Sequence, residues 1–317
     1  MPALKNKLLD RLPGDEDLEL CLGLFSFLGE SAATPVEPVY TQLARLEGPE
    51  NAIEVLQLDR PVTGRGNRDG VYWVSAENLQ LSWVYVPEVA VDEVEDLSRD
   101  SYLKLLEQVH SSGFPELVRF WNFLPHINQG NGDRELYKRF CTGRLDAFNT
   151  CNVSEAKYPA ASALGHYQAG MTIAVLSSHR AARHFHNPRQ VDAYKYPRQY
   201  GPSSPSFARA SLLQLGSSSL YFVSGTASIV GHNSVHIDEL EPQLETTADN
   251  IRCLLDEAGF AISDINLLRV YLRNVQDKAE CARVLDGLFP RVETLYLHAD
   301  VCRAELLVEI ECICSKN

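Results

Sequence analysis

The sequence predicts an α+β protein built from two units of similar plan. Helix, turn and strand follow one another in the same order in both halves, and the Gly-Phe pair that ends the first helix at Gly113 recurs at Gly259. Two strands precede each of these helices, which gives each unit the order ββαβαββ. Helices that back one face of a mixed sheet make an α+β fold. We place the units at residues 1–178 and 179–317.

The first unit alternates between apolar runs typical of strands and runs with helical spacing. In chain order we expect strands over 17–29 and 72–86, a helix over 101–110, a strand over 118–123, a helix over 134–148 and a strand over 169–176. Gly113 ends the first helix, and Tyr158-Pro159 breaks the chain before the last strand.

The second unit repeats this order with a clearer pattern. Leu244, Ile251, Leu254 and Leu255 recur at helical spacing, and Gly259 supplies a C-terminal stop. We expect strands over 210–216 and 219–230, a helix over 244–258, a strand over 267–272, a helix over 278–288, and strands over 294–299 and 306–314.

The net charge argues against a nucleic-acid partner. The 317 residues include 29 Lys and Arg against 42 Asp and Glu, a formal net charge of -13. Binding to a phosphate backbone needs many cationic contacts, so we expect no nucleic-acid partner. A hydrophobic share of 45% and a charged share of 22% are typical of globular proteins.

Targeting signals and metal-binding cysteine patterns are not evident. The N-terminus lacks the basic and apolar regions of a signal peptide, and no stretch has about 18 apolar residues in a row, so we expect a cytoplasmic protein without a membrane partner. The eight cysteines are scattered among apolar neighbours and are expected to be small core residues. Cys312 and Cys314 are too close in sequence for a zinc knuckle.

A basic segment over 179–210 separates the elements of the two units. It is rich in Pro, Gly and Ser, and between His179 and Arg209 it holds six cationic residues against Asp192 alone; they are Arg180, Arg183, Arg189, Lys195, Arg198 and Arg209. A long irregular segment in a compact protein is usually functional or disordered. Two interpretations stay open: a loop that holds a small anion, and a solvated linker whose charges match an acidic surface.

Five segments resemble signature stretches of the chorismatase family, whose members split chorismate into pyruvate and a six-membered-ring acid. They are LYFVSGTASIVGH (220–232), ADVCRAELLVEIE (299–311), RFWNFLPHIN (119–128), YKRFCTGRLDAF (137–148) and NPRQVDAYKYPRQYGPSSPSFARA (187–210). The resemblance runs from about residue 115 to the end of the chain and is weak in the first hundred residues.

The second unit also resembles the RidA (YjgF) family, in which a helix-backed sheet assembles as a trimer with sites between subunits. This resemblance implies a pseudo-oligomer within one chain, with a degenerate RidA-like unit over 1–178 and a catalytic RidA-like unit over 179–317. The site would lie in the cleft between the units, lined by the basic segment. We expect such a fused chain to be a monomer.

The last strand carries the candidate acid. Cleavage of the enolpyruvyl ether of chorismate requires a proton on the methylene carbon, and an acid that is protonated near neutral pH is a buried carboxyl group. Alternation places Glu309 and Glu311 on one face, where each carboxylate raises the pKa of the other. The resemblance implies that Glu309 is the general acid. The competing interpretation is a strand whose glutamates face solvent.

Three arginines lie within family-like segments and are candidates to bind the two carboxylates of chorismate: Arg144, Arg209 and Arg303. Arginine binds a carboxylate through two parallel hydrogen bonds. Tyr196 and Tyr200 could add phenol donors. Each arginine could instead be a surface charge or belong to a structural ion pair.

Small residues and one cysteine complete the predicted binding site. The segment Gly225-Thr226-Ala227 allows a ligand to approach the backbone closely, although a strand kink explains the same residues. The resemblance associates a cysteine at Cys302 with the branch of the family that forms hydroxybenzoate. A half-buried strand cysteine is the alternative.

We expect neither a metal nor another cofactor. His184 and His186 lie among arginines that would repel a cation, and His232 and His236 have no carboxylate or cysteine to complete a ligand set. Glycine-rich motifs for nucleotide phosphates are absent.

The predicted function is chorismate cleavage to pyruvate and 3-hydroxybenzoate, alone or with 4-hydroxybenzoate. One alternative is hydrolysis to pyruvate and a dihydroxycyclohexadiene carboxylate. A second is a RidA-like imine deaminase, but the arginine that family needs has no counterpart at Val292, two residues after Phe289-Pro290, or near Tyr296. A third is a ligand-binding module that has lost the chemistry.

Overall fold

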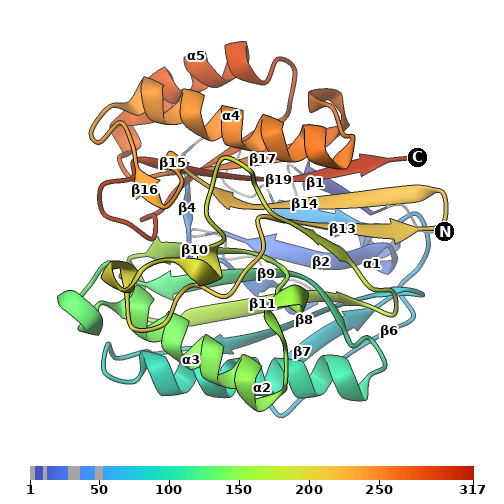
Figure 1. The fold of residues 1–317 in the computed structure, drawn as a ribbon. Helices are drawn as coiled ribbons and strands as arrows, with labels where there is room; N and C mark the ends of the chain where they lie inside the picture. The colour runs from blue at the N-terminus through green and yellow to red at the C-terminus, as the bar shows by residue number, and fades with distance from the viewer. Residues whose placement is uncertain (1–3, 10–12, 28–35, 47–52) are drawn as a thin grey trace.

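Two helix-backed sheets lie face to face, so that the layers run helix, sheet, sheet, helix across the molecule (Figure 1). The computed structural model describes residues 4–9, 13–27, 36–46 and 53–317. Helices α2 and α3 cover the outer face of one sheet, and α4 and α5 cover the outer face of the other. The two inner faces meet in the middle of the molecule.

The first unit has the predicted order ββαβαββ. Its elements are β7 (Val71–Ser75), β8 (Leu79–Val86), α2 (Val94–Ser111), β9 (Glu116–Pro125), α3 (Leu136–Thr150), β10 (Ala160–His166) and β11 (Met171–Ser178). The strand order across the sheet is β10-β9-β11-β8-β7, and β6 (Gly64–Arg68) extends one edge. The sheet is mixed, because β10 pairs in parallel with β9 while the neighbouring pairs are antiparallel.

The second unit repeats this topology strand for strand. Its elements are β13 (Ala210–Leu215), β14 (Ser218–Thr226), α4 (Leu240–Ala258), β17 (Ile265–Leu272), α5 (Lys278–Leu288), β18 (Thr294–His298) and β19 (Val308–Lys316). The order β18-β17-β19-β14-β13 matches that of the first unit, with β12 (Arg183–Phe185) and β4 (Ala44–Arg45) at the two edges. The predicted α+β fold of two ββαβαββ units is confirmed.

Residues before the first unit form a separate small sheet. Its strands are β1 (Lys5–Leu9), β5 (Ile53–Gln57), β2 (Cys21–Ser26) and β3 (Val39–Tyr40), and α1 (Asp15–Glu19) precedes β2. The prediction that 17–29 is the first strand of the first unit was therefore wrong, and residues 28 and 29 lie outside the described residues. The real first pair is the hairpin β7–β8, because the polar residues Glu77 and Asn78 turn the chain inside the single predicted strand 72–86.

Short elements complete the described chain. The hairpin β15 (Ile229–Val230) and β16 (Asn233–Ser234) follows β14. Single turns of 3-10 helix occur at Gly132–Arg134, Glu155–Lys157, Ala193–Lys195, Arg198–Tyr200, Ile262–Asp264 and Val275–Asp277. Two predicted helix stops are confirmed by backbone geometry, since Gly113 and Gly259 have φ of 82° and 73°, which favours glycine.

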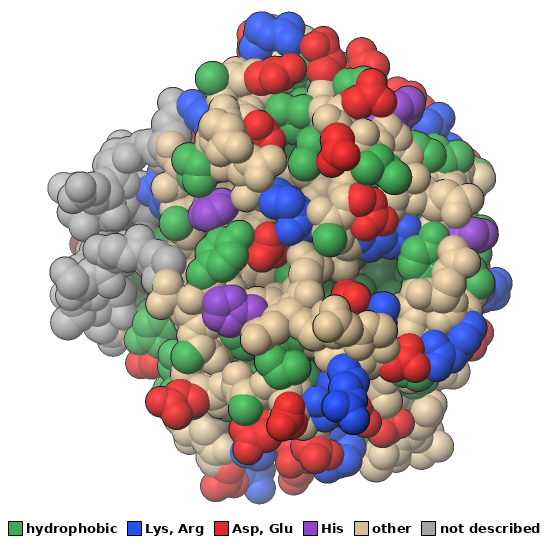
Figure 2. Space-filling view, turned by 90° about the vertical axis from the view of Figure 1, so that its left-hand side faces the viewer, with side chains coloured by type: hydrophobic (Ala, Val, Ile, Leu, Met, Phe, Trp, Pro, Cys, Tyr) green, Lys and Arg blue, Asp and Glu red, His purple; other side chains and the backbone are tan. Residues whose placement is uncertain are grey.

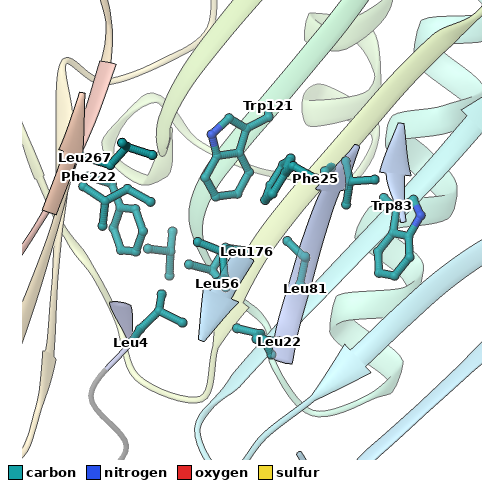
Figure 3. Packing of buried hydrophobic residues seen from close by; sticks show 14 of the residues in the cluster. Leu4, Leu22, Phe25, Leu56, Leu81, Trp83, Trp121, Leu176, Phe222 and Leu267 are labelled. Carbon is teal, nitrogen blue, oxygen red and sulfur yellow. The ribbon is translucent and has the colours of Figure 1, made fainter. Parts of the chain in front are cut away.

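The main hydrophobic core lies where the three sheets meet. Figure 3 shows its packing, with Phe25 of β2 and Trp121 of β9 in edge-to-face contact at 5.4 Å between ring centroids. Leu81 of β8, Phe222 of β14 and Leu267 of β17 belong to the same cluster. The inner faces of both units and of the small sheet are therefore apolar, and any charged group among them needs a specific partner.

One close helix contact depends on a glycine. Gly143 of α3 lies against the backbone of α2, and a Cβ atom there would overlap the backbone of Glu95 and Arg99. Gly287 of α5 is also helical, but nothing lies within 4 Å of the place a Cβ would take. The two glycines therefore form a natural pair for comparison.

We predict that Gly143→Ala destabilises the protein by about 1–3 kcal/mol, because the two helices must move apart to admit the methyl group. Gly287→Ala is expected to leave stability unchanged or to raise it by up to about 1 kcal/mol through better helix propensity. Urea unfolding followed by circular dichroism measures both. Equal effects of the two variants would contradict the packing described for Gly143.

Candidate active site

A cavity of about 410 Å³ opens where the two units meet. Its walls come from the start of α3, the segment 196–209, the end of β14, the loop 302–305 and β19. These segments gather at the left-hand end of the molecule in Figure 1, and Figure 2 looks onto that end, where a hollow is bordered by acidic and basic side chains. The site therefore draws on both units, as the pseudo-oligomer hypothesis expects.

Glu309 lies at the floor of this cavity and is 5% exposed. Its neighbour across the sheet is the end of β14, where the register with β19 shifts between Val223 and Thr226. Gly225 lies in this bulge, and a Cβ there would overlap the Glu309 carboxyl group. The glycine is therefore needed to make room for the acid, whichever ligand the cavity holds.

Burial raises the pKa of Glu309 to about 8, and the negative charge of Glu311 adds to this rise. Arg119 and Arg209 act in the opposite direction without cancelling it. The carboxyl group is therefore mostly protonated at neutral pH. The competing interpretation, in which the glutamates of this strand face solvent, is wrong, because Glu309 and Glu311 are both buried between the sheets.

Glu311 remains ionised because it is held by cationic and polar donors. Its Oε2 accepts a hydrogen bond from Arg119 Nη2 at 2.6 Å, and its Oε1 accepts bonds from Trp121 Nε1 at 3.0 Å and Arg269 Nη1 at 2.9 Å. Burial alone would raise its pKa, but Arg119 and Arg269 outweigh burial and lower it. The two glutamates are thus in opposite protonation states.

Arg209 extends into the cavity from the segment before β13 and is 5% exposed. Its Nη2 donates to the Val191 carbonyl at 2.8 Å and to the Tyr196 hydroxyl at 2.7 Å. Its Nε is buried without a hydrogen-bond partner. This leaves an N–H group of a cation available to a ligand.

Arg303 lines the cavity from the loop before β19 and lies against two tyrosine rings. Its guanidinium carbon is 3.9 Å from the Tyr200 ring centroid and 5.1 Å from that of Tyr196. Its Nη1 donates to His232 O at 2.9 Å and Ser234 Oγ at 3.0 Å, and its Nη2 is buried without a partner. Cation–π contact and these bonds hold the arginine rigidly.

Arg144 lies deeper and is 2% exposed. It borders a small cavity of about 30 Å³ that shares Tyr137, Gly225, Cys302 and Glu309 with the main one. Its Nε is also buried without a partner. Within the described residues, none of Arg144, Arg209 and Arg303 forms an ion pair, so the interpretation of these three as structural ion pairs is wrong.

The other cations of the basic segment do not serve the cavity. Three of them form ion pairs with carboxylates: Arg189 Nη2 lies 3.6 Å from Asp249 Oδ2, Lys195 Nζ lies 2.8 Å from Asp192 Oδ2, and Arg198 Nη2 lies 2.6 Å from Asp133 Oδ2. Arg180 and Arg183 are exposed. The net charge of the segment therefore overstates the positive charge available to a ligand, because Asp249 and Asp133, which lie outside the segment, neutralise two of its cations.

The small residues predicted to bind a ligand have different positions. Gly225 and Ala227 line the cavity, whereas the Thr226 hydroxyl is buried and donates to Ser224 O at 2.8 Å. Cys302 lines the cavity beside Glu309. Burial, followed by the charge of Glu309, raises the pKa of Cys302 to about 12, so the side chain is a neutral thiol.

Several lining residues were not singled out from the sequence. Tyr137 contributes to both cavities, and burial raises its pKa well above its usual value, so its phenol is neutral. Phe207 and Asn128 also line the main cavity. All three lie within or at the end of the quoted signature segments, and a residue-by-residue reading of those segments was the signal that could have found them.

The histidines do not form a metal cluster in the part of the chain that the structure describes. His186 pairs with Asp192, and His184 Nδ1 lies 2.9 Å from Ser211 Oγ. Val292 and Tyr296, the two positions where the RidA family would have its arginine, do not line the cavity. Within the described residues, no helix has the length and apolar character to cross a membrane.

Comparisons with known proteins match both units. A family model described as "Chorismatase FkbO/Hyg5-like, N-terminal" matches residues 54–177, and one described as "Endoribonuclease L-PSP" matches residues 210–316. A 3-hydroxybenzoate synthase of Streptomyces hygroscopicus is 34% identical over 263 residues, 78% of this chain and 76% of the relative. A chorismatase of Streptomyces rapamycinicus is 32% identical, over 78% of this chain and 77% of the relative. A crystal structure of a chorismatase superposes with a TM-score of 0.84 at 28% identity, covering 99% of this chain and 98% of the other.

We predict that Glu309→Gln stabilises the protein at neutral pH. The unfolded chain releases the Glu309 proton near pH 4.5, whereas the folded protein holds it until about pH 8, so the stability from this group is full below the lower value and is lost as pH rises through the higher one. Glutamine has no proton to release. The free energy of unfolding of the variant should exceed that of the native protein by roughly 2–4 kcal/mol at pH 7.5.

Urea unfolding at pH 5.0 and 7.5 measures this difference, which should shrink at the lower pH. Glu257→Gln, on the exposed face of α4, is the control and should change stability little at either pH. A Glu309→Gln variant that is less stable than the native protein at pH 7.5 would contradict the proton held by Glu309.

Proposed function

The chain belongs to the chorismatase family, and we propose that it cleaves the enolpyruvyl ether of chorismate to pyruvate and 3-hydroxybenzoate. The observation that carries the proposal is the buried Glu309, whose pKa is raised to about 8, in a cavity lined by Arg209 and Arg303, with Arg144 at the small cavity beside it and no carboxylate partner on any of the three arginines. Chorismate has two carboxylates and needs a proton on carbon. The cavity offers cationic donors that can bind the carboxylates and an acid that can protonate the carbon.

Substrate binding is assigned to the arginines and the tyrosine hydroxyls. Arg209 and Arg303 line the cavity from different segments of the chain, and each has an N–H group without a hydrogen-bond partner, so each can bind one carboxylate or both can bind the same one. Arg144 is deeper, where the ring carboxylate or the pyruvyl carboxylate would be fully desolvated. Tyr196 and Tyr200 orient the arginines and supply hydroxyl groups at the rim.

The proposed first step is proton transfer from Glu309 to the methylene carbon of the enolpyruvyl group. The C–H bond that forms uses the π electrons of the enol ether, and an oxocarbenium ion results while Glu309 becomes a carboxylate. This negative charge then faces the cation formed in the same step. Glu311 stays ionised throughout, because Arg119 and Arg269 hold it in that state.

The product depends on which nucleophile attacks the oxocarbenium ion. Attack by the adjacent ring hydroxyl gives a cyclic ketal. One ring carbon–oxygen bond then breaks as pyruvate leaves with that oxygen, and the Glu309 carboxylate takes up a ring proton, so hydroxybenzoate forms with no net consumption of water. Attack by water gives pyruvate and the dihydroxycyclohexadiene carboxylate. We assign the first course to this chain, with 3-hydroxybenzoate formed alone or with 4-hydroxybenzoate, because the relative from Streptomyces hygroscopicus is a 3-hydroxybenzoate synthase and Cys302 lies beside Glu309.

The organisation of the chain is part of the proposal. We assign residues 1–178 to a degenerate unit and residues 179–317 to the catalytic unit, because the acid lies on β19. A monomer suffices, since walls from both units already enclose the cavity. We propose that this monomer acts in the cytoplasm without a cofactor and without a nucleic-acid partner.

We predict that the native protein releases pyruvate from chorismate and that Glu309→Gln loses at least about 1,000-fold in kcat, since the amide cannot supply the proton. Liquid chromatography of the products distinguishes 3-hydroxybenzoate, 4-hydroxybenzoate and the dihydrodiol. In the native protein kcat/KM should fall as pH rises through about 8, because only the protonated acid is active. Unchanged turnover by the glutamine variant would refute the role of Glu309.

We also predict that Arg209→Gln raises KM for chorismate about 10–100-fold, because a hydrogen bond to a charged group is lost in a desolvated cavity. Arg183→Gln is the matched control, since Arg183 belongs to the same basic segment but is exposed and outside the cavity. Steady-state kinetics of pyruvate release measures both. Equal KM values for the two variants would contradict substrate binding by Arg209, and turnover of 2-iminopropionate instead of chorismate would favour the imine deaminase.

A further inference from the structure

A chain of four buried charges runs between the three sheets beside the cavity. Arg269 Nε donates to both carboxylate oxygens of Glu54 at 2.8 and 2.7 Å, and Arg269 Nη1 donates to Glu311 Oε1 at 2.9 Å. Arg119 Nη2 donates to Glu311 Oε2 at 2.6 Å. The order Glu54, Arg269, Glu311, Arg119 therefore alternates in sign from end to end.

Each member comes from a different strand. Glu54 is on β5 of the small N-terminal sheet, Arg269 and Glu311 are on β17 and β19 of the second unit, and Arg119 is on β9 of the first unit. Side-chain exposure is between 0% and 5% for all four. An aromatic ring packs against these charges, since the guanidinium carbon of Arg269 lies 4.4 Å from the ring centroid of Phe25. Water therefore screens these charges very little.

The four charges sum to zero, and Glu309 is the carboxyl group next to them that has no cation of its own. Arg119 is shared with Glu311, and its Nη1 has no hydrogen-bond partner. Ionisation of Glu309 would give the cluster a net negative charge in a dry environment. Charge balance within the cluster therefore favours the neutral acid.

Other polar groups face Glu309 from every element packed against it. From the strands these are Glu311 on β19, Tyr271 on β17 in register with Glu309, Arg119 on β9 and Ser162 on β10. From the remaining segments they are Arg209 before β13, Tyr137 and Arg144 on α3, and Cys302 and Arg303 in the loop before β19. The tyrosines and the cysteine are neutral, since burial raises the pKa of each. Arg144, Arg209 and Arg303 are the cations that a dicarboxylate would neutralise on binding.

We propose that Glu54, which lies outside the cavity, is a positioning residue for catalysis: through Arg269 and Glu311 it balances the buried charge beside Glu309 and keeps that carboxyl group protonated. The inference rests on the proposed function for its catalytic meaning. It assigns a role in the reaction to the N-terminal sheet, which contributes no lining residue to the cavity within the described residues.

Removal of the negative charge of Glu54 should move the titration of Glu309 in one direction, to lower pH. In Glu54→Gln, Arg119 and Arg269 face Glu311 alone, so the cluster gains a net positive charge. A positive charge favours the ionised form of Glu309, so the proton should be lost at a lower pH. Arg269 cannot relieve this charge by deprotonation, because guanidinium stays protonated in proteins.

The test is a titration of the Glu309 carboxyl carbon by NMR in protein labelled with ¹³C at the glutamate side-chain carboxyl, without substrate. Comparison with Glu309→Gln assigns the signal. We expect Glu54→Gln to lower the titration midpoint by one pH unit or more, and to move the alkaline limb of kcat/KM for chorismate by the same amount. Glu54→Asp keeps the charge and should restore the native midpoint.

A double variant separates charge from packing. Glu54→Gln combined with Arg269→Met removes one charge of each sign, so the cluster is again neutral and the midpoint should return to within about half a unit of the native value. A purely structural role of Glu54 predicts a larger disturbance in the double variant than in the single one. If Glu54→Gln does not fold, Glu311→Gln leaves the same net positive charge and should also lower the midpoint.

An unchanged Glu309 midpoint in folded Glu54→Gln would overturn the proposal, as would a double variant displaced further than the single one. The titration is independent of the proposed function, because it uses no substrate. If the native protein releases no pyruvate from chorismate while the NMR midpoints shift as expected, the function fails and the charge coupling stands. If pyruvate is released and the midpoints do not move, the coupling fails and the function stands.

Discussion

Two carboxyl groups on one face of β19, buried between the inner faces of two sheets, set the constraint on which the site depends. Glu309 and Glu311 follow the two-residue period of a strand, so neither can leave the interface without the other. Buried in apolar surroundings, both would otherwise be neutral. Arginines from two other strands hold Glu311 ionised, and that ionised neighbour helps to keep the proton on Glu309.

Duplication of the unit explains where these groups come from. Each sheet has an outer face covered by helices and an inner face that needs a partner, and the second copy supplies it. In the second unit the central strand β19 carries the acid, and in the first unit β9 carries Arg119 on the facing surface. The interface between two units of unlike sequence thus carries the acid on one side and the counter-charge of Arg119 on the other.

The sequence predicted the fold and most of the site because periodicity and motif spacing carry that information. The alternation in LLVEIECIC assigned Val308 and Ile310 to the face covered by the helices and Glu309 to the other face, and the structure confirms both.

Strand β10 was missed because AASALGH is made mainly of small residues with little strand propensity. The role of Glu54 could not be predicted, since its contact with Arg269 joins residues 215 positions apart through tertiary packing alone. The positive charge that the basic segment 179–210 offers a ligand was overestimated for the same reason, because Asp133 and Asp249, the partners of Arg198 and Arg189, lie elsewhere in the sequence.

The cavity keeps its acid and its cations apart, and this separation decides what it can bind. Had one of Arg144, Arg209 and Arg303 paired with Glu309, the acid would have lost its proton and the arginine its affinity for an anion. Instead Arg209 and Arg303 are held by carbonyl and hydroxyl groups and by aromatic rings, which orient a guanidinium without neutralising it. The ligand must then bring the negative charges itself. A neutral substrate would leave the arginines without an anionic partner, so the same arrangement that keeps Glu309 acidic also favours a dianion.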